Sequence, residues 1–94
     1  EFILAQLLEE NTPVYQNFIS LLTDNQLQLM QAIAREGKVA TPNSGEFVKR
    51  YGLIASRSVN TALKSLQEKE LVYKADKGYI VYDRFMALWL ATLP

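Results

Sequence analysis

The strongest constraint in this sequence is a pair of helical patterns separated by a short turn that contains glycine. The first pattern is GEFVKRY, from Gly45 to Tyr51, and the second is SRSVNTALKSL, from Ser56 to Leu66. Only about four residues, Gly52 to Ala55, lie between them. Two helices joined by so short a turn are typical of a helix-turn-helix motif. The sequence therefore predicts this motif over residues 45–69.

The second of these helices separates apolar from polar side chains. Its apolar residues recur at positions i, i+3, i+4 and i+7, which places them on one stripe that faces a core. They are Val59, Ala62, Leu63 and Leu66. We expect Ser56 to cap the helix at its N-terminus. The outward side chains can bond phosphates or the edges of bases. They are Arg57, Ser58, Asn60, Thr61 and Lys64.

The segment before the helix-turn-helix has clear signals for the start and the end of a helix. Thr23 and Gln26 have the spacing of a capping box, in which each side chain bonds the backbone of the other residue. Gly37 supplies the backbone freedom that ends a helix. These signals predict a helix over Asp24 to Arg35 that completes a three-helix unit.

Two further helices are predicted before residue 23. The pattern FILAQLLEE places apolar residues on one stripe and stops at Asn11. Thr12 is expected to cap a second helix, with Pro13 at its first position, where the missing N–H costs nothing. Both apolar stripes are expected to face the core. They comprise Ile3, Leu4, Leu7 and Leu8 in the first helix and Val14, Phe18, Leu21 and Leu22 in the second.

The period of the apolar residues changes after Glu70. LVYKA and GYIVY are short runs rich in β-forming residues, and DKG lies between them, which predicts a hairpin with a tight turn. Val39 is expected in a further short strand. Asp83 is expected to cap a final helix, RFMALWLATL. Three large apolar side chains of this helix must contact a partner surface, and they are Phe85, Leu88 and Trp89.

A helix-turn-helix followed directly by a two-stranded hairpin is the arrangement of a winged helix. The predicted fold class is therefore mainly α with a small β-hairpin: a winged helix-turn-helix with extra N-terminal helices and a C-terminal helix. Ninety-four residues suffice for about one hydrophobic core. We expect residues 1–22 to form an N-terminal helical segment and residues 23–94 to form the winged-helix domain.

The composition excludes several classes of chemistry. The chain has no cysteine and no histidine, which removes disulfides, zinc fingers and the usual general base. It has no GxxxxGK[ST] phosphate loop, and no apolar run approaches the roughly 20 residues of a membrane span. We therefore expect a cytoplasmic domain with no catalytic residue, no bound cofactor or metal, and no contact with a membrane.

The charge of the chain is balanced overall but unevenly distributed. The net charge is zero, with −4 over residues 1–47 and +4 over the remainder. The segment from Lys49 to Lys77 has seven basic and three acidic residues. A net charge of +4 is small for a phosphate-binding surface, so a surface that faces a protein or solvent fits these residues at least as well as DNA does. Outside the helix that begins at Ser56, the candidate contacts for phosphates or an acidic surface are Lys49, Arg50, Lys74 and Lys77.

A series of motifs runs through the C-terminal half of the chain: YGL, SV followed by ALKSLQEKELV, the glycine-tyrosine strand, and the aspartate that precedes FMALWL. Through these motifs, about three-quarters of the chain is similar to the C-terminal winged-helix region of the archaeal-type ATPases, a family of AAA-like P-loop proteins. Family members often have proline after this aspartate, where this chain has Arg84. The resemblance implies that an upstream domain of the intact protein binds ATP and Mg²⁺ and hydrolyses ATP. The helices before Leu22 would link that domain to the winged helix.

Two functions from different classes are consistent with these observations. In the first, the chain is the winged-helix module of an ATPase, and it contacts double-stranded DNA or packs against the ATPase domain to couple nucleotide state to partner binding. In the second, it is a protein-interaction or dimerisation module with no role in nucleic-acid binding. The surface of that module would be Phe85, Leu88, Trp89 and the N-terminal stripe Ile3, Leu4, Leu7 and Leu8.

Overall fold

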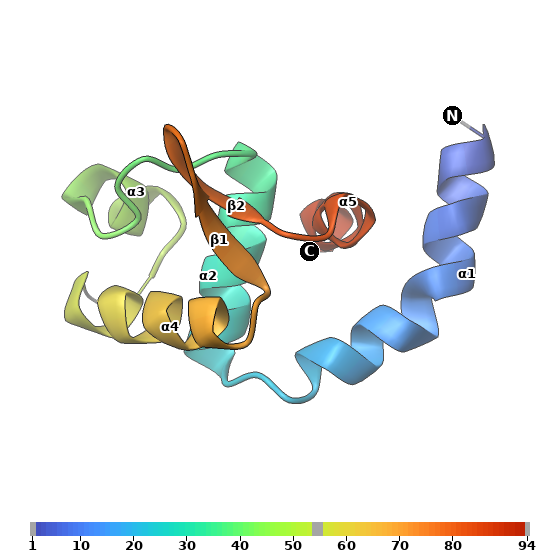
Figure 1. The fold of residues 1–94 in the computed structure, drawn as a ribbon, viewed down its shortest axis with the longest axis horizontal. Helices are drawn as coiled ribbons and strands as arrows, with labels where there is room; N and C mark the ends of the chain where they lie inside the picture. Colours follow the sequence, from blue (N-terminus) through green and yellow to red (C-terminus); the bar gives the residue numbers. More distant parts are fainter. Residues whose placement is uncertain (1, 54–55, 94) are drawn as a thin grey trace.

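The fold is a set of helices closed by a small hairpin. The structure, a computed structural model, describes residues 2–53 and 56–93, without the side chains at positions 2, 4, 5, 7, 8 and 56. Its elements are α1 (Phe2–Ile19), α2 (Asp24–Glu36), α3 (Gly45–Arg50), α4 (Ser56–Glu68), β1 (Val72–Ala75), β2 (Gly78–Val81) and α5 (Arg84–Thr92). Figure 1 shows α2 near the centre and α1 standing to one side. The predicted mainly helical fold with a hairpin after the helix-turn-helix is confirmed.

The hydrophobic core surrounds α2. This helix packs against α4, α5 and β2, so its apolar residues have neighbours on several sides. Each fully buried side chain of this size contributes about 1.5–3 kcal/mol relative to an exposed one. The largest fully buried side chains are Leu29, Met30 and Ile33 of α2, Leu66 of α4, Val72 of β1 and Leu90 of α5.

The predicted caps of α2 and α5 are present. The hydroxyl of Thr23 accepts from the backbone N–H of Gln26 at 3.2 Å, and the Gln26 side chain accepts from the backbone N–H of Thr23 at 3.1 Å. Gly37 ends α2 with φ of 86°, and its N–H donates to the carbonyl of Ile33. The carboxylate of Asp83 accepts from the backbone N–H groups of Phe85 and Met86, in the first turn of α5. These bonds satisfy donors that a helix end leaves without partners.

The helix-turn-helix begins at Ser44, whose hydroxyl accepts from the backbone N–H of Phe47 at 3.2 Å. The buried ring of Phe47 anchors the short helix α3 to the core. Gly52 supplies the turn with φ of 65°, a conformation that costs glycine little. Ser56 is the first residue of α4 rather than its cap, and the preceding position lies outside the described residues.

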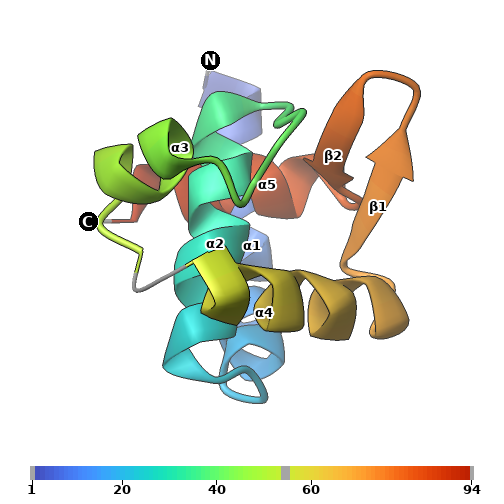
Figure 2. The ribbon, with the colours of Figure 1, turned by 90° about the vertical axis from the view of Figure 1, so that its left-hand side faces the viewer.

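The hairpin pairs β1 with β2 in antiparallel register. Val72 lies opposite Val81, and Ala75 lies opposite Gly78, so two residues form the turn. The predicted strand residue Val39 forms an isolated bridge with Tyr79, whose backbone exchanges both hydrogen bonds with it. This bridge ties the hairpin to the segment between α2 and α3. Figure 2 shows α3, α4 and the hairpin along one face of the molecule.

The N-terminal segment differs from the prediction, because it is one helix rather than two. α1 continues through Pro13, and Figure 1 shows it changing direction along its length. Proline in a helix interior removes one backbone hydrogen bond and bends the helix without always ending it. The predicted break at Asn11 and the predicted cap at Thr12 are therefore wrong.

The predicted inward face of this segment is also wrong for three of its residues. Val14, Phe18 and Leu21 are exposed, whereas Leu22 is partly buried. The buried residue is Tyr15, whose ring lies 5.3 Å from the ring of Trp89. α1 packs against α5 along this contact, so α5 covers the side of α1 that bears Tyr15. The exposed residues Val14 and Phe18 of the predicted stripe lie on other sides of α1.

Candidate nucleic-acid interface

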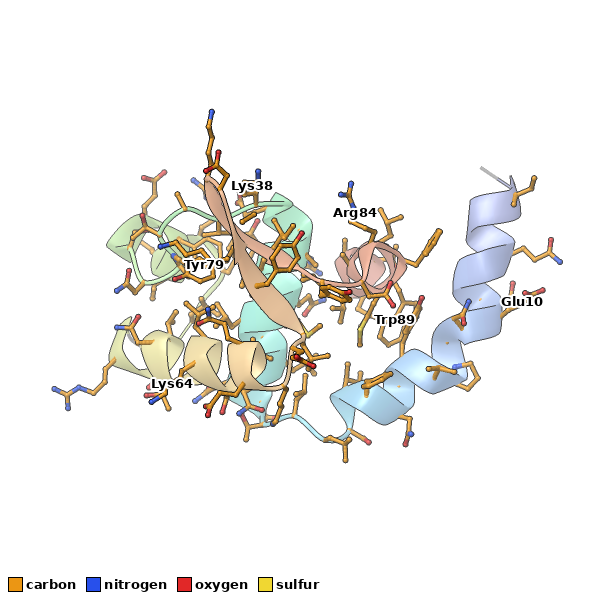
Figure 3. The ribbon with its side chains drawn as sticks, viewed as in Figure 1. Glu10, Lys38, Lys64, Tyr79, Arg84 and Trp89 are labelled. Carbon is orange, nitrogen blue, oxygen red and sulfur yellow. The ribbon has the colours of Figure 1, made fainter. Side chains whose placement is uncertain are left out.

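The outward face of α4 is polar along the helix. Arg57, Asn60, Thr61 and Lys64 are all exposed. Figure 3 shows Lys64 extending from the outer side of α4. The opposite face packs on α2 and β1, as the predicted stripe requires, because Val59, Ala62, Leu63 and Leu66 are all buried. The core therefore fixes which face of α4 is presented to a partner.

The start of α4 adjoins the start of α2. Arg57, Ser58 and Thr61 line a shallow depression of about 330 Å³ together with Thr23, Asn25 and Gln26. Ser58 is only partly exposed there, which distinguishes it from the other predicted contacts on α4. Lys69 also reaches this region, since its ammonium donates to the side chain of Gln26 at 3.2 Å. Sequence reasoning did not single out Lys69, because nothing in its spacing places it near α2.

Arg50 is engaged within the domain. Its guanidinium lies 2.7 Å from the carboxylate of Glu36 and 2.8 Å from that of Glu46. The hydroxyl of Tyr51 donates to the same Glu36 carboxylate at 2.7 Å. These hydrogen bonds, first from Tyr51 and then from Arg50, lower the pKa of Glu36, and the bond to Glu36 raises the pKa of Tyr51. Of the two cations predicted on α3, Lys49 is exposed and Arg50 is already neutralised.

The two lysines of the hairpin differ in their surroundings. Lys74 places its ammonium 5.9 Å from the centre of the Tyr79 ring, within the range of a cation–π contact. Lys77 lies in the exposed turn beside Asp76, whose opposite charge lowers the local positive potential. The hairpin thus presents two exposed ammonium groups.

The predicted protein interface divides into buried and exposed parts. Figure 3 shows Trp89 between α5 and α1, where it is buried against Tyr15. Its partner surface therefore lies within this chain. Phe85 and Leu88 remain 49% and 44% exposed. In the N-terminal stripe, Ile3 is exposed, and the side chains of Leu4, Leu7 and Leu8 lie outside the described residues.

Phe85 and Leu88 line an open groove of about 720 Å³ between the end of α2, β2 and α5. Two exposed cations, Lys38 and Arg84, line the same groove, and sequence reasoning did not group them because 46 positions separate them in the chain. The exposed apolar residues Val14 and Phe18 of α1 were likewise missed as a surface. Val14 follows Leu7 by seven residues, and this helical spacing across Pro13 was the signal that could have indicated it.

The described residues hold no cluster of three or more carboxylates that could bind a metal ion. Within those same residues, no helix combines the length and the apolar character that a membrane crossing requires.

Comparison with known protein families identifies the fold independently. A family model described as a probable winged helix domain matches residues 13–92, from the middle of α1 to the end of α5. No curated protein and no solved structure matches the chain significantly.

Proposed function

Because this chain belongs to the winged-helix domain family, we propose that it contacts double-stranded DNA through the outward face of α4 and through the hairpin. The observation that favours this function is the arrangement of Arg57 and Lys64 on one exposed side of α4. Neither cation is in an ion pair with any of the described residues. Two such groups on one helix face can contact phosphates on either side of a DNA groove, while Asn60 lies between the two cations.

The proposed contact is weak and mainly electrostatic. Lys49, Lys74 and Lys77 would add phosphate contacts, whereas Arg50 is left out of the proposal because Glu36 and Glu46 already neutralise it. With so few phosphates neutralised, the affinity should be modest and should fall steeply as salt is raised. We assign the domain no catalytic role, since winged-helix domains are generally non-catalytic.

A salt titration of duplex binding tests the proposal. Fluorescence anisotropy of a labelled duplex should show binding at low salt, with a slope of roughly −0.9 in log K against log salt for each phosphate contact. Arg57→Ala combined with Lys64→Ala should weaken binding and make this slope shallower by about 2. The matched control is Lys38→Ala combined with Arg84→Ala, which removes the same two residue types away from α4.

The outcome that contradicts DNA contact is equally specific. The absence of binding at low salt with the chain at tens of micromolar would exclude several phosphate contacts. An affinity that does not change with salt concentration would exclude them as well. Equal loss in the α4 variant and in the control would show a general charge effect rather than a site. Circular dichroism spectra of both variants should match that of the unaltered chain, because all four altered side chains are exposed.

We also propose that the domain is a cytoplasmic module of a larger P-loop ATPase, in which it couples nucleotide state to partner binding. The support is the sequence similarity over YGL, ALKSLQEKELV and FMALWL. ATP and Mg²⁺ would then bind in that upstream domain. The intact protein should have a GxxxxGK[ST] segment before residue 1. Its ATP hydrolysis should respond to duplex DNA, and the response should be lost with Arg57→Ala and Lys64→Ala.

The second candidate function is protein interaction. Phe85 and Leu88 favour it, because two large apolar side chains of one helix stay exposed beside a groove.

A further inference from the structure

The groove beside α5 has an apolar floor. Its walls come from α2, β2 and α5, and its apolar lining residues are Ala34, Ile80, Val81, Phe85, Ala87 and Leu88. An open groove of about 720 Å³ with this lining can accept large side chains from another helix or strand. Its apolar surface is costly to leave in water.

The rim of the groove is positively charged. Three charged residues line it, and they are Glu36, Lys38 and Arg84. The Glu36 carboxylate already bonds the Arg50 guanidinium and the Tyr51 hydroxyl. Lys38 and Arg84 are both exposed, and Figure 3 shows their side chains extending to the same side of the molecule. The charge that a partner meets here is therefore that of two cations.

α1 presents a surface of the opposite character. Its apolar residues Ile3 and Val14 are exposed, at 71% and 52%, and Leu21, in the turn that follows the helix, is 72% exposed. Glu10 falls on the same side of α1 as Ile3 and Val14, because spacings of seven and four residues return to one helix face. Glu9 adjoins it, and the α1 sequence contains no basic residue. An apolar stripe with acidic charge at its middle complements an apolar groove with a basic rim.

The stripe of α1 is turned away from its own domain. Tyr15 holds α1 against Trp89 of α5, and this contact fixes which side of the helix faces inward. Figure 3 shows Glu10 pointing outward, away from the other elements. The stripe is thus available to a groove on a different molecule rather than to the groove of its own chain.

Pairing of two α1 helices is less favourable than pairing of α1 with the groove. Glu9 and Glu10 stand near the middle of α1, which spans Phe2–Ile19. Parallel and antiparallel pairing both bring these carboxylates of two copies close together, and like charges at short range repel. Docking beside Lys38 and Arg84 replaces that repulsion with attraction.

We propose that the groove of one copy receives the α1 stripe of a second copy, with Glu9 and Glu10 beside Lys38 and Arg84. The inference develops the protein-interaction candidate and does not depend on DNA contact by α4. Two copies related by a twofold axis would exchange α1 helices reciprocally, so that both grooves are filled in one closed dimer.

Charge reversal on each side of the contact tests the proposal with the 94-residue chain. One variant is Lys38→Glu combined with Arg84→Glu, and the other is Glu9→Lys combined with Glu10→Lys. Sedimentation velocity over a concentration series should show the unaltered chain passing from monomer to dimer. Each variant alone should dimerise at least about tenfold more weakly, since both of its contacts then join like charges. All four side chains are exposed, so the variants should keep the fold.

Mixing the two variants gives the decisive result. In the mixed dimer, one contact pairs the original α1 with the original groove, and the other pairs the reversed α1 with the reversed groove. Both contacts are then complementary, so the mixture should dimerise with an affinity near that of the unaltered chain. A mixture that stays as weak as its components would overturn the proposal. So would an unaltered chain that remains monomeric at millimolar concentration.

Substitution of the groove floor gives a second check. Phe85→Ser should weaken dimerisation, because Phe85 lines the groove, whereas Tyr82→Ser should not, because Tyr82 is exposed outside it. If the groove variants leave the dimer unchanged while Leu21→Asp abolishes it, the two α1 helices pair with each other and the groove is not the site.

Discussion

α1 and α4 are both amphipathic helices, yet they present opposite faces to the outside. α4 buries Val59, Leu63 and Leu66 and exposes a charged side. α1 buries Tyr15 and exposes Val14 and Phe18. The cause is the number of neighbours, because α4 packs on both α2 and β1 whereas α1 packs along α5. A hydrophobic stripe shows that a helix has an apolar side, but the neighbouring elements determine whether that side is covered.

This difference gives the domain two outer surfaces of different chemistry. The α4 surface is polar and has unpaired cations among its described residues, which suits phosphates. The α1 surface is apolar and acidic, which suits a groove with basic edges. Because the two surfaces belong to different helices, substitutions can alter one and leave the other intact.

Removal of a buried side chain from α4 should cost much more than the same change in the turn that continues the exposed apolar side of α1. Leu66 is 0% exposed, and Leu66→Ala should lower the free energy of unfolding by about 3–5 kcal/mol. Leu21 is 72% exposed, and Leu21→Ala should change it by less than about 0.5 kcal/mol. Urea denaturation followed by circular dichroism measures both. Similar losses would mean that the α1 stripe is buried in solution.

Most of the fold was predictable from local signals. The capping residues Thr23, Ser44 and Asp83 and the turn before Gly78 have physical roles that depend on the nearest few residues. The course of α1 was not predictable in this way. Pro13 suits both the first turn of a new helix and a bend within a longer one, and the difference depends on packing at Tyr15.

Loss of the contact between α1 and α5 should release α1 alone. Tyr15 is 5% exposed and packs on Trp89, so Tyr15→Ala should lower the local stability of α1 by about 2 kcal/mol. Hydrogen exchange should become faster in α1, while α2 and α4 keep most of their protection. Val14→Ala is the matched control on the exposed side, and it should leave exchange in α1 nearly unchanged. Uniform loss of protection throughout the chain would show instead that α1 belongs to the central core.

The attachment of the hairpin should depend on one glycine. A Cβ at Gly78 would lie 2.8 Å from the carbonyl oxygen of Val39, which is too close for the bridge between Val39 and Tyr79 to keep its geometry. Gly78→Ala should therefore destabilise the domain by about 1–2 kcal/mol. Gly45→Ala is the control, since nothing lies within 4 Å of its Cβ position, and it should be neutral or slightly stabilising. Equal thermal midpoints for the two variants would refute this account of Gly78.

The candidate sites were predictable only where one helix supplies the residues. The exposed residues of α4 follow from its apolar stripe, since Arg57 and Lys64 must lie opposite Val59 and Leu66. The groove joins Lys38 to Arg84 through the packing of α2 against α5, which no local pattern encodes. For the same reason, the pairing of Arg50 with Glu36 was missed.

The smallest expected effect concerns the Glu36 carboxylate, which joins α2 to α3 through Tyr51 and Arg50. Because those hydrogen bonds lower its pKa in the folded chain, the stability that it supplies is present above the ordinary carboxyl value of about 4.3. That stability is lost as the pH falls through the lower pKa of the folded state. Glu36→Gln should therefore be less stable than the unaltered chain at pH 7, and the difference should shrink in acid.

Urea denaturation of both chains between pH 7 and pH 3 measures this difference. Tyr51→Phe provides the control, because the Tyr51 hydroxyl is the larger cause of the lowered pKa of Glu36. In a Tyr51→Phe background, Glu36→Gln should lower the free energy of unfolding at pH 7 by less than it does in the unaltered chain. As the pH falls, this loss should also disappear at a higher pH than in the unaltered chain. A difference that is the same at pH 7 and pH 3 would mean that Glu36 acts through packing rather than through its charge.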